Sequence, residues 1–113
     1  MGLDKLINAF IYSLSGIKFL LKERAFVQEL VLGVFLSVIL YFSRNTLAEI
    51  MYILSSYFLV LITEALNTSI ETVVDRISLE QNPLSKKAKD IGSAAVFLSF
   101  LHFGIVIILL IKF

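Results

Sequence analysis

The sequence predicts an all-α integral membrane protein, with three transmembrane helices and an amphipathic N-terminal helix at the membrane surface, in a single domain of residues 1–113. Of the 113 residues, 58% are hydrophobic and 17% are charged, and the mean hydropathy is +0.92. A soluble domain of this length needs a larger polar shell. The apolar residues also form three separate stretches, too few strands to close a β-barrel in lipid. Membrane-spanning helices are therefore the predicted architecture.

The first element, residues 2–24, is expected to be a helix lying on the membrane surface. Its apolar residues recur at intervals of three and four, and polar residues mostly occupy the other faces. This pattern is typical of an interfacial helix. No small-residue cleavage site follows it, which disfavours a signal peptide. The stripe consists of Leu3, Ile7, Phe10, Leu14, Ile17 and Leu21.

The three spans are expected at residues 27–43, 47–75 and 84–112, the second with a cytoplasmic extension and the third with a cytoplasmic start. The uncharged run Ile91–Ile111 alone satisfies the requirement of about 20 helical residues for a bilayer core. The other two spans reach that length by including a few polar residues at their ends. Asn82 and Pro83 predict the start of the third helix, with Asn as the cap and Pro at the first helical position.

The basic residues predict the orientation of the chain. Eight of the ten lie before the first span or between the second and third spans, and only Arg44 and Lys112 fall on the other side. Because basic loops remain in the cytoplasm, the N-terminus is expected to be cytoplasmic and the C-terminus outside, in a bacterial inner membrane. The eight are Lys5, Lys18, Lys22, Arg24, Arg76, Lys86, Lys87 and Lys89.

Composition excludes several kinds of function. The chain has no cysteine, so it has no disulfide, thiolate metal site or cysteine nucleophile. A single histidine excludes a polyhistidine metal site within one copy. A net charge of +1 gives no reason to expect nucleic acid as a partner. The lone His102 lies in an apolar run and is expected to be packed or hydrogen-bonded.

Carboxylates in apolar surroundings are the features that most need a reason. Glu64, Asn67, Glu71 and Asp75 are spaced three, four and four residues apart, so they share one helix face. Aligned carboxylates repel one another, and Lys89, Arg24 or a divalent metal could neutralise them. Glu29 is a further acid, near the start of the first span. A charged side chain deep in the bilayer costs about 2.5–3.5 kcal/mol, so such acids need a reason.

Several functions could account for these acids. Polar residues hydrogen-bond across membrane helices, so a non-catalytic membrane adaptor could use the stripe for assembly. Intramembrane carboxylates also couple proton movement in transporters, which makes a small proton-coupled transporter a second alternative. Acids beside a basic loop also suit phosphoryl transfer, with carboxylates holding Mg²⁺ and one carboxylate as the base. The five glycines are isolated, so a nucleotide site here would not be a P-loop.

Two motifs resemble the prokaryotic diacylglycerol kinase family, which includes undecaprenol kinases. They are EALNTSIETVVDRI at Glu64–Ile77 and KAKDIGSAAV at Lys87–Val96, and the similarity extends over almost the whole chain. The resemblance implies a small homotrimeric enzyme with three transmembrane helices per subunit and active sites shared between subunits. It also implies transfer of the ATP γ-phosphate to a lipid alcohol with Mg²⁺. Residues Asp75–Ile77 and Gly92–Ala95 look like the diacylglycerol branch, with undecaprenol kinase as the alternative.

The resemblance also assigns roles to individual residues. Glu64 looks like the general base, and Asn67 like a catalytic residue that orients Glu64 or a phosphate. Glu23 and Glu71 look like the carboxylates that hold ATP-bound Mg²⁺. The other nucleotide positions it suggests are Lys5, Tyr12, Glu80, Lys89 and Asp90, and the other lipid positions are Phe26, Gln28, Glu29 and Ser93.

Overall fold

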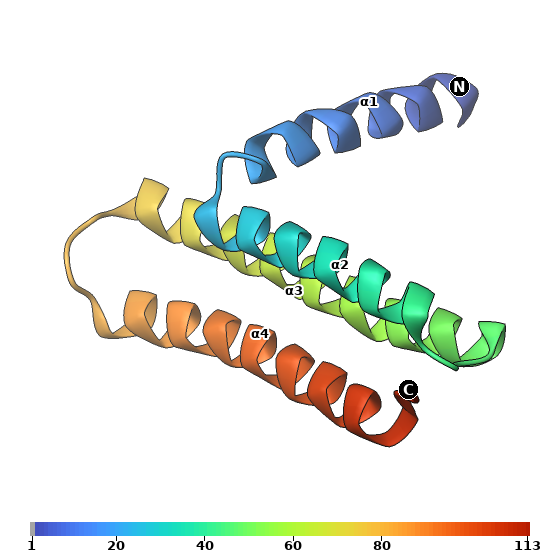
Figure 1. The fold of residues 1–113 in the computed structure, drawn as a ribbon. Helices are drawn as coiled ribbons and strands as arrows, with labels where there is room; N and C mark the ends of the chain where they lie inside the picture. Colours follow the sequence, from blue (N-terminus) through green and yellow to red (C-terminus); the bar gives the residue numbers. More distant parts are fainter. Residues whose placement is uncertain (1) are drawn as a thin grey trace.

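The computed structural model describes residues 2–113, which form four α-helices and no strand (Figure 1). They are α1 (Gly2–Leu20), α2 (Arg24–Phe42), α3 (Leu47–Ile77) and α4 (Pro83–Leu110). Three of them, α2, α3 and α4, are long and apolar enough to cross a membrane. The predicted fold class is therefore confirmed, and the chain is a multi-pass membrane protein.

Side-chain caps fix where α3 and α4 begin. Thr46 precedes α3, and its hydroxyl accepts a hydrogen bond from the Glu49 backbone N–H at 3.3 Å. Asn82 precedes α4, and its Oδ1 accepts from the Leu84 N–H at 2.8 Å, with Pro83 at the first helical position. The predicted start of this helix is confirmed.

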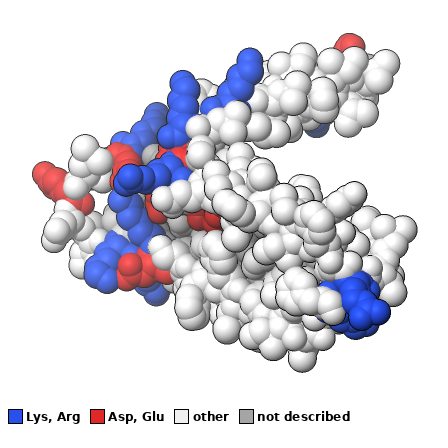
Figure 2. Space-filling view, viewed as in Figure 1, with Lys and Arg blue, Asp and Glu red and all other residues white. Residues whose placement is uncertain are grey.

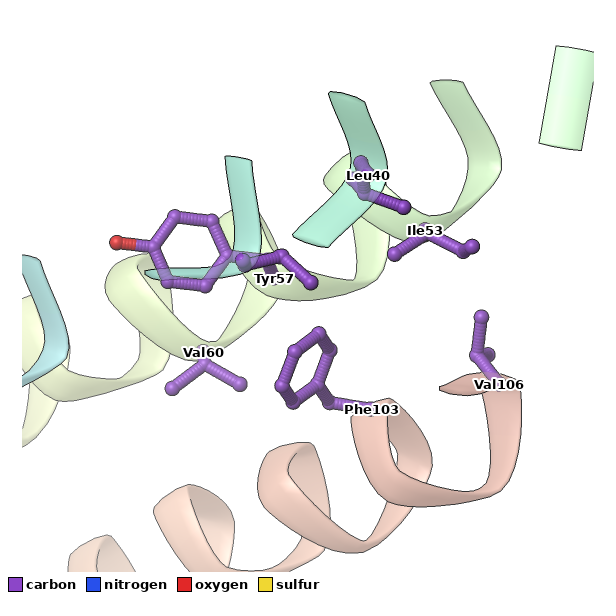
Figure 3. Close-up of a cluster of buried hydrophobic side chains, with 7 residues drawn as sticks. Leu40, Ile53, Tyr57, Val60, Phe103 and Val106 are labelled. Carbon is purple, nitrogen blue, oxygen red and sulfur yellow. The ribbon is translucent and has the colours of Figure 1, made fainter. Parts of the chain in front are cut away.

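The long helix α3 lies between α2 and α4 and packs against both, more extensively against α4 (Figure 1). Buried side chains from all three helices form one core toward the end of the bundle that carries the C-terminus (Figure 3). Within a bilayer such a core is stabilised by close van der Waals packing, because lipid tails are as apolar as these side chains. The core residues are Leu36, Leu40, Ile53, Tyr57, Val60, Phe103 and Val106.

A hydrogen-bonded clasp closes the end of the bundle farthest from the α3–α4 loop. Asn45, in the α2–α3 turn, donates from Nδ2 to the Leu110 carbonyl at 2.6 Å and accepts from the Lys112 backbone N–H at 3.0 Å. The Lys112 Nζ lies 2.9 Å from Glu49 Oε1. These bonds join the end of α4 to the turn before α3, and so fix the register of α4 along α3.

Most of the apolar surface is not covered by the chain itself. Helix α1 buries none of its residues and diverges from the three-helix bundle (Figure 1). In the most apolar stretches of α2, α3 and α4, only 22%, 28% and 17% of the residues are buried. Such faces need lipid or other protein copies around them.

Charged side chains gather at one end of the molecule. Figure 2 shows acidic and basic groups together where α2 begins, α3 ends and α4 begins, while the middle of the three-helix bundle is uncharged in this view. A smaller basic patch lies at the opposite end, where the Arg44 N–H donates to the Lys112 carbonyl at 2.8 Å. This division matches the uneven distribution of basic residues in the sequence.

Candidate functional site

The polar stripe on α3 leads from the interior of the bundle to its charged end. Glu64 and Asn67 are buried, Glu71 is half-buried, and Asp75 is exposed. The Asn67 Nδ2 donates to Glu71 Oε1 at 3.0 Å, one helical turn further along. The prediction that these residues share one helix face is confirmed for Asn67 and Glu71 by this contact.

Carboxylates from α2 converge on the same stripe. Glu64 lies close enough to Glu71 and Glu23 for their charges to interact, and Glu29 is similarly close to Glu64. Glu23 occupies the cap position of α2, and its side chain makes no capping hydrogen bond there. Three carboxylates, Glu23, Glu29 and Glu71, thus lie near the buried Glu64, and negative charge gathered in this way attracts a cation.

Gly92 allows α4 to approach this cluster. A Cβ atom at Gly92 would overlap Asn67 Oδ1, so any larger residue there would have to displace the Asn67 amide. That Oδ1 atom is buried and has no hydrogen-bond partner among the described residues. The small residues Gly92–Ala95 predict close helix packing at the start of α4, but the sequence does not identify Asn67 as the contact.

A cavity of about 300 Å³ opens beside Glu64 between α2, α3 and α4. Both Glu64 and Glu29 line it, and Glu29 Oε2 is a buried atom with no hydrogen-bond partner among the described residues. The Tyr57 hydroxyl donates to the Glu29 backbone carbonyl at 2.7 Å and braces this turn of α2. The remaining lining residues are Ala25, Gln28, Leu32, Val96 and Phe100. An amphiphile with a hydroxyl head and apolar tails fits such a lining.

A larger cavity, of about 670 Å³, lies at the charged end between the last turn of α3, the loop and the first turns of α4. Lys89, Asp75 and Glu80 are among its lining residues. The Lys89 Nζ lies 2.7 Å from Asp75 Oδ1, which joins α4 to α3. Polar and basic groups around a hollow of this size suit a phosphorylated ligand better than an apolar one.

The single chain brings some of the predicted residues together and leaves others apart. Glu23, Glu29 and Glu71 lie near Glu64, and Asn67 is bonded to Glu71. Gln28 lines the cavity beside Glu64. Phe26 is buried, whereas Ser93 is exposed beside Gly92. Asp90 pairs with Lys86 at 2.6 Å, and Glu80 lies in the loop. Lys5 and Tyr12 on α1 are exposed and have no hydrogen bond or ion pair within residues 2–113.

The donors of the cluster fit Mg²⁺ when phosphate oxygens complete its ligand shell. Within the described chain, no group of three histidine, cysteine or acidic side chains could hold a metal by itself. Magnesium commonly takes only one or two protein carboxylates plus substrate phosphates. Glu71, with the unpartnered Asn67 Oδ1 beside it and Glu23 across Glu64, supplies oxygen donors of this type.

The fold and the site together define a small helical membrane protein with a buried acidic cluster between an amphiphile cavity and a charged, solvent-facing cavity. Residues 11–111 match the family model for prokaryotic diacylglycerol kinase. The chain belongs to this family, which confirms the resemblance drawn from the motifs and the expected enzyme class, a lipid kinase. The membership also disfavours the transporter and adaptor alternatives.

Individual relatives agree with this assignment. A diacylglycerol kinase from Haemophilus influenzae is 46% identical over 106 residues, covering 93% of this chain and 90% of the relative. The diacylglycerol kinase of Pseudomonas aeruginosa is 42% identical, covering 87% and 80% of the two chains. That of Escherichia coli is 41% identical, covering 88% and 83%. Similarity of this extent spans the whole bundle and not one motif alone.

Proposed function

We propose that this protein transfers the γ-phosphate of ATP to the hydroxyl of diacylglycerol, giving phosphatidic acid and ADP. The observation that carries the proposal is the place of buried Glu64, which lines the amphiphile cavity while its neighbours Asn67 and Glu71 lead toward the charged cavity. A lipid hydroxyl and a phosphate chain can meet only where two such sites adjoin.

Glu64 is proposed as the general base. Its carboxylate accepts the proton of the lipid hydroxyl as that oxygen attacks the γ-phosphorus, and the bond from phosphorus to the β–γ bridging oxygen breaks. Asn67 is held by its bond to Glu71 and orients Glu64 or a phosphate oxygen. A base placed by surrounding helices loses little freedom on reaction, which lowers the barrier.

Glu23 and Glu71 are proposed to hold Mg²⁺ together with the nucleotide phosphates. When bound, the metal neutralises charge that develops on the transferred phosphoryl group. Lys89 lies on the same side of the cluster, lines the charged cavity and offers ammonium donors to the phosphates. Asp90 and Glu80 are proposed as further nucleotide contacts, with Lys5 and Tyr12 reaching the nucleotide from α1.

Diacylglycerol is proposed to enter sideways from the bilayer. Gln28 and Glu29 line the cavity beside Glu64, so their polar groups can receive the glycerol head while Leu32, Val96 and Phe100 contact its apolar part. Phe26 and Ser93 are proposed as further lipid contacts. The arrangement keeps the reacting hydroxyl at the depth of Glu64 without lifting the chains into water.

The proposed setting is the bacterial inner membrane, with the N-terminus and the charged end of the bundle in the cytoplasm, where ATP is present. We also propose a homotrimer with sites shared between subunits. The large uncovered apolar surface of α2–α4 and the unpartnered helix α1 support association. One chain also leaves the charged cavity open to its surroundings, which a neighbouring subunit would cover.

One assay tests this proposal. Purified protein in mixed micelles is incubated with γ-labelled ATP, Mg²⁺ and either diacylglycerol or undecaprenol, and labelled lipid is extracted. The proposal predicts labelled phosphatidic acid with diacylglycerol as the preferred acceptor. Preferential labelling of undecaprenol would make the protein an undecaprenol kinase, and no labelled lipid with either acceptor would reject a lipid kinase.

A further inference from the structure

The proposed mechanism gives Lys89 a role but gives none to Asp75, the carboxylate with which it pairs. Asp75 is the last member of the α3 stripe, and Lys89 is the only residue to which its carboxylate is bonded within residues 2–113. The distance between Lys89 Nζ and Asp75 Oδ1 is 2.7 Å, across two helices and 14 residues of chain. This is the cross-helix ion pair of the charged end, and it lines the larger cavity.

The pair contributes little to folding. Both side chains are about half-exposed, 41% for Lys89 and 47% for Asp75. An exposed ion pair in water is weak, since solvent screens the charges and ordering two side chains costs entropy. Its position beside the reaction centre is therefore a stronger reason for it than stability.

Glu71 lies one helical turn before Asp75 on the same face of α3, so it is a second carboxylate near the Lys89 ammonium group. Lys89 is close enough to Glu71 for their charges to interact, so its Nζ lies within the influence of two carboxylates on α3. If Asp75 were neutral, Glu71 would be the nearest anion left to attract Lys89. An ion pair between Lys89 and Glu71 would block the carboxylate that is proposed to hold Mg²⁺ with the nucleotide.

We propose that Asp75 is a positioning residue for Lys89, which it holds off the Glu71 carboxylate and directs toward the nucleotide phosphates. The inference rests on the proposed function and adds a residue to it. The ammonium group has three N–H donors, of which one reaches Asp75, so two are available for phosphate oxygens. Asp75 itself touches no reacting atom in this account.

The test uses the purified protein in micelles and the non-hydrolysable analogue AMP-PCP, with binding measured by calorimetry at a low and a high Mg²⁺ concentration. Asp75→Asn should weaken binding about tenfold, the size of one lost charge interaction. Raising Mg²⁺ should recover part of this loss, because the metal then displaces Lys89 from Glu71. Asp75→Glu should restore binding, and the KM for diacylglycerol should stay unchanged.

The Lys89→Met background separates positioning from independent binding. Asp75→Asn should cause no further loss there, because no ammonium is left to misplace. The matched control is Lys112→Met, which breaks the ion pair at the other end of the bundle and should leave AMP-PCP binding unchanged.

Binding by Asp75→Asn within about twofold of wild type would overturn the inference. So would a loss of equal size in both backgrounds, which would mean that Asp75 acts without Lys89. Since the binding measurement needs no lipid, it is independent of the acceptor assay. If the variants show this coupling between Asp75 and Lys89 but the wild-type protein phosphorylates no lipid, the proposed function is overturned and the coupling stands.

Discussion

At the scale of single residues, the account depends on why the bundle keeps carboxylates where apolar side chains would be cheaper. Glu29 and Glu64 are buried, and Glu29 Oε2 has no partner in the described chain. An unpartnered buried polar atom costs about 1–3 kcal/mol. Glu71 differs, because it is half-buried and accepts a bond from Asn67. The deep acids therefore suit a lipid hydroxyl and a proton, and the shallower one suits a cation.

This division predicts the effect of Glu71→Ala. Loss of a proposed metal-holding carboxylate should raise the KM for Mg·ATP at least about tenfold, with the KM for diacylglycerol little changed. Steady-state kinetics at several Mg²⁺ concentrations would measure both values. A metal dependence identical to that of the wild type would remove Glu71 from the proposed metal site.

At the scale of helices, the sequence predicted which segments are helical better than it predicted which faces of those helices contact one another. Length and hydropathy identify α2, α3 and α4, and Asn82-Pro83 marks the start of α4, because these depend on local chemistry. The prediction that His102 is packed or hydrogen-bonded is wrong for the single chain, where it is exposed and has no hydrogen bond within residues 2–113. An apolar run does not reveal which of its faces meets another helix.

Close approaches between helices were only partly visible in the sequence. Gly33 accommodates the Tyr57 ring and Gly92 accommodates Asn67, yet Gly104, also in α4, has open space where a Cβ would be. The run of small residues after Gly92 indicates close packing there, but Gly33 and Gly104 each stand between large apolar residues and cannot be distinguished by sequence. Only the packing of α3 against its neighbours shows which ones need the missing side chain.

The two glycines of α4 give a matched test. Gly92→Ala should destabilise the fold or displace Asn67, at a cost of about 1–3 kcal/mol, and should lower turnover. Gly104→Ala should instead be neutral or stabilise by up to about 1 kcal/mol, since alanine favours helix and meets no atom there. Thermal unfolding in micelles and the kinase assay would measure the two effects. Equal tolerance of both substitutions would contradict the proposed close contact at Gly92.

At the scale of the whole molecule, charged and apolar surfaces occupy different parts of the bundle. Acidic and basic groups gather at the end where α2 begins, α3 ends and α4 begins (Figure 2). The Asn45 clasp closes the opposite end. The sequence predicted this division from its basic residues and the α3 stripe. It could not predict the two cavities, which form between helices distant in the chain, nor the clasp, which joins residues more than 60 positions apart.

The central claim is that Glu64 removes the proton of a lipid alcohol, and Glu64→Gln tests it most directly. The amide keeps the size of the side chain and cannot act as the base. The account predicts that turnover of diacylglycerol falls at least about a hundredfold, while AMP-PCP binding in the presence of Mg²⁺ stays within about threefold of wild type. A variant that retains more than about a tenth of the wild-type rate would contradict the claim, because such activity requires another base.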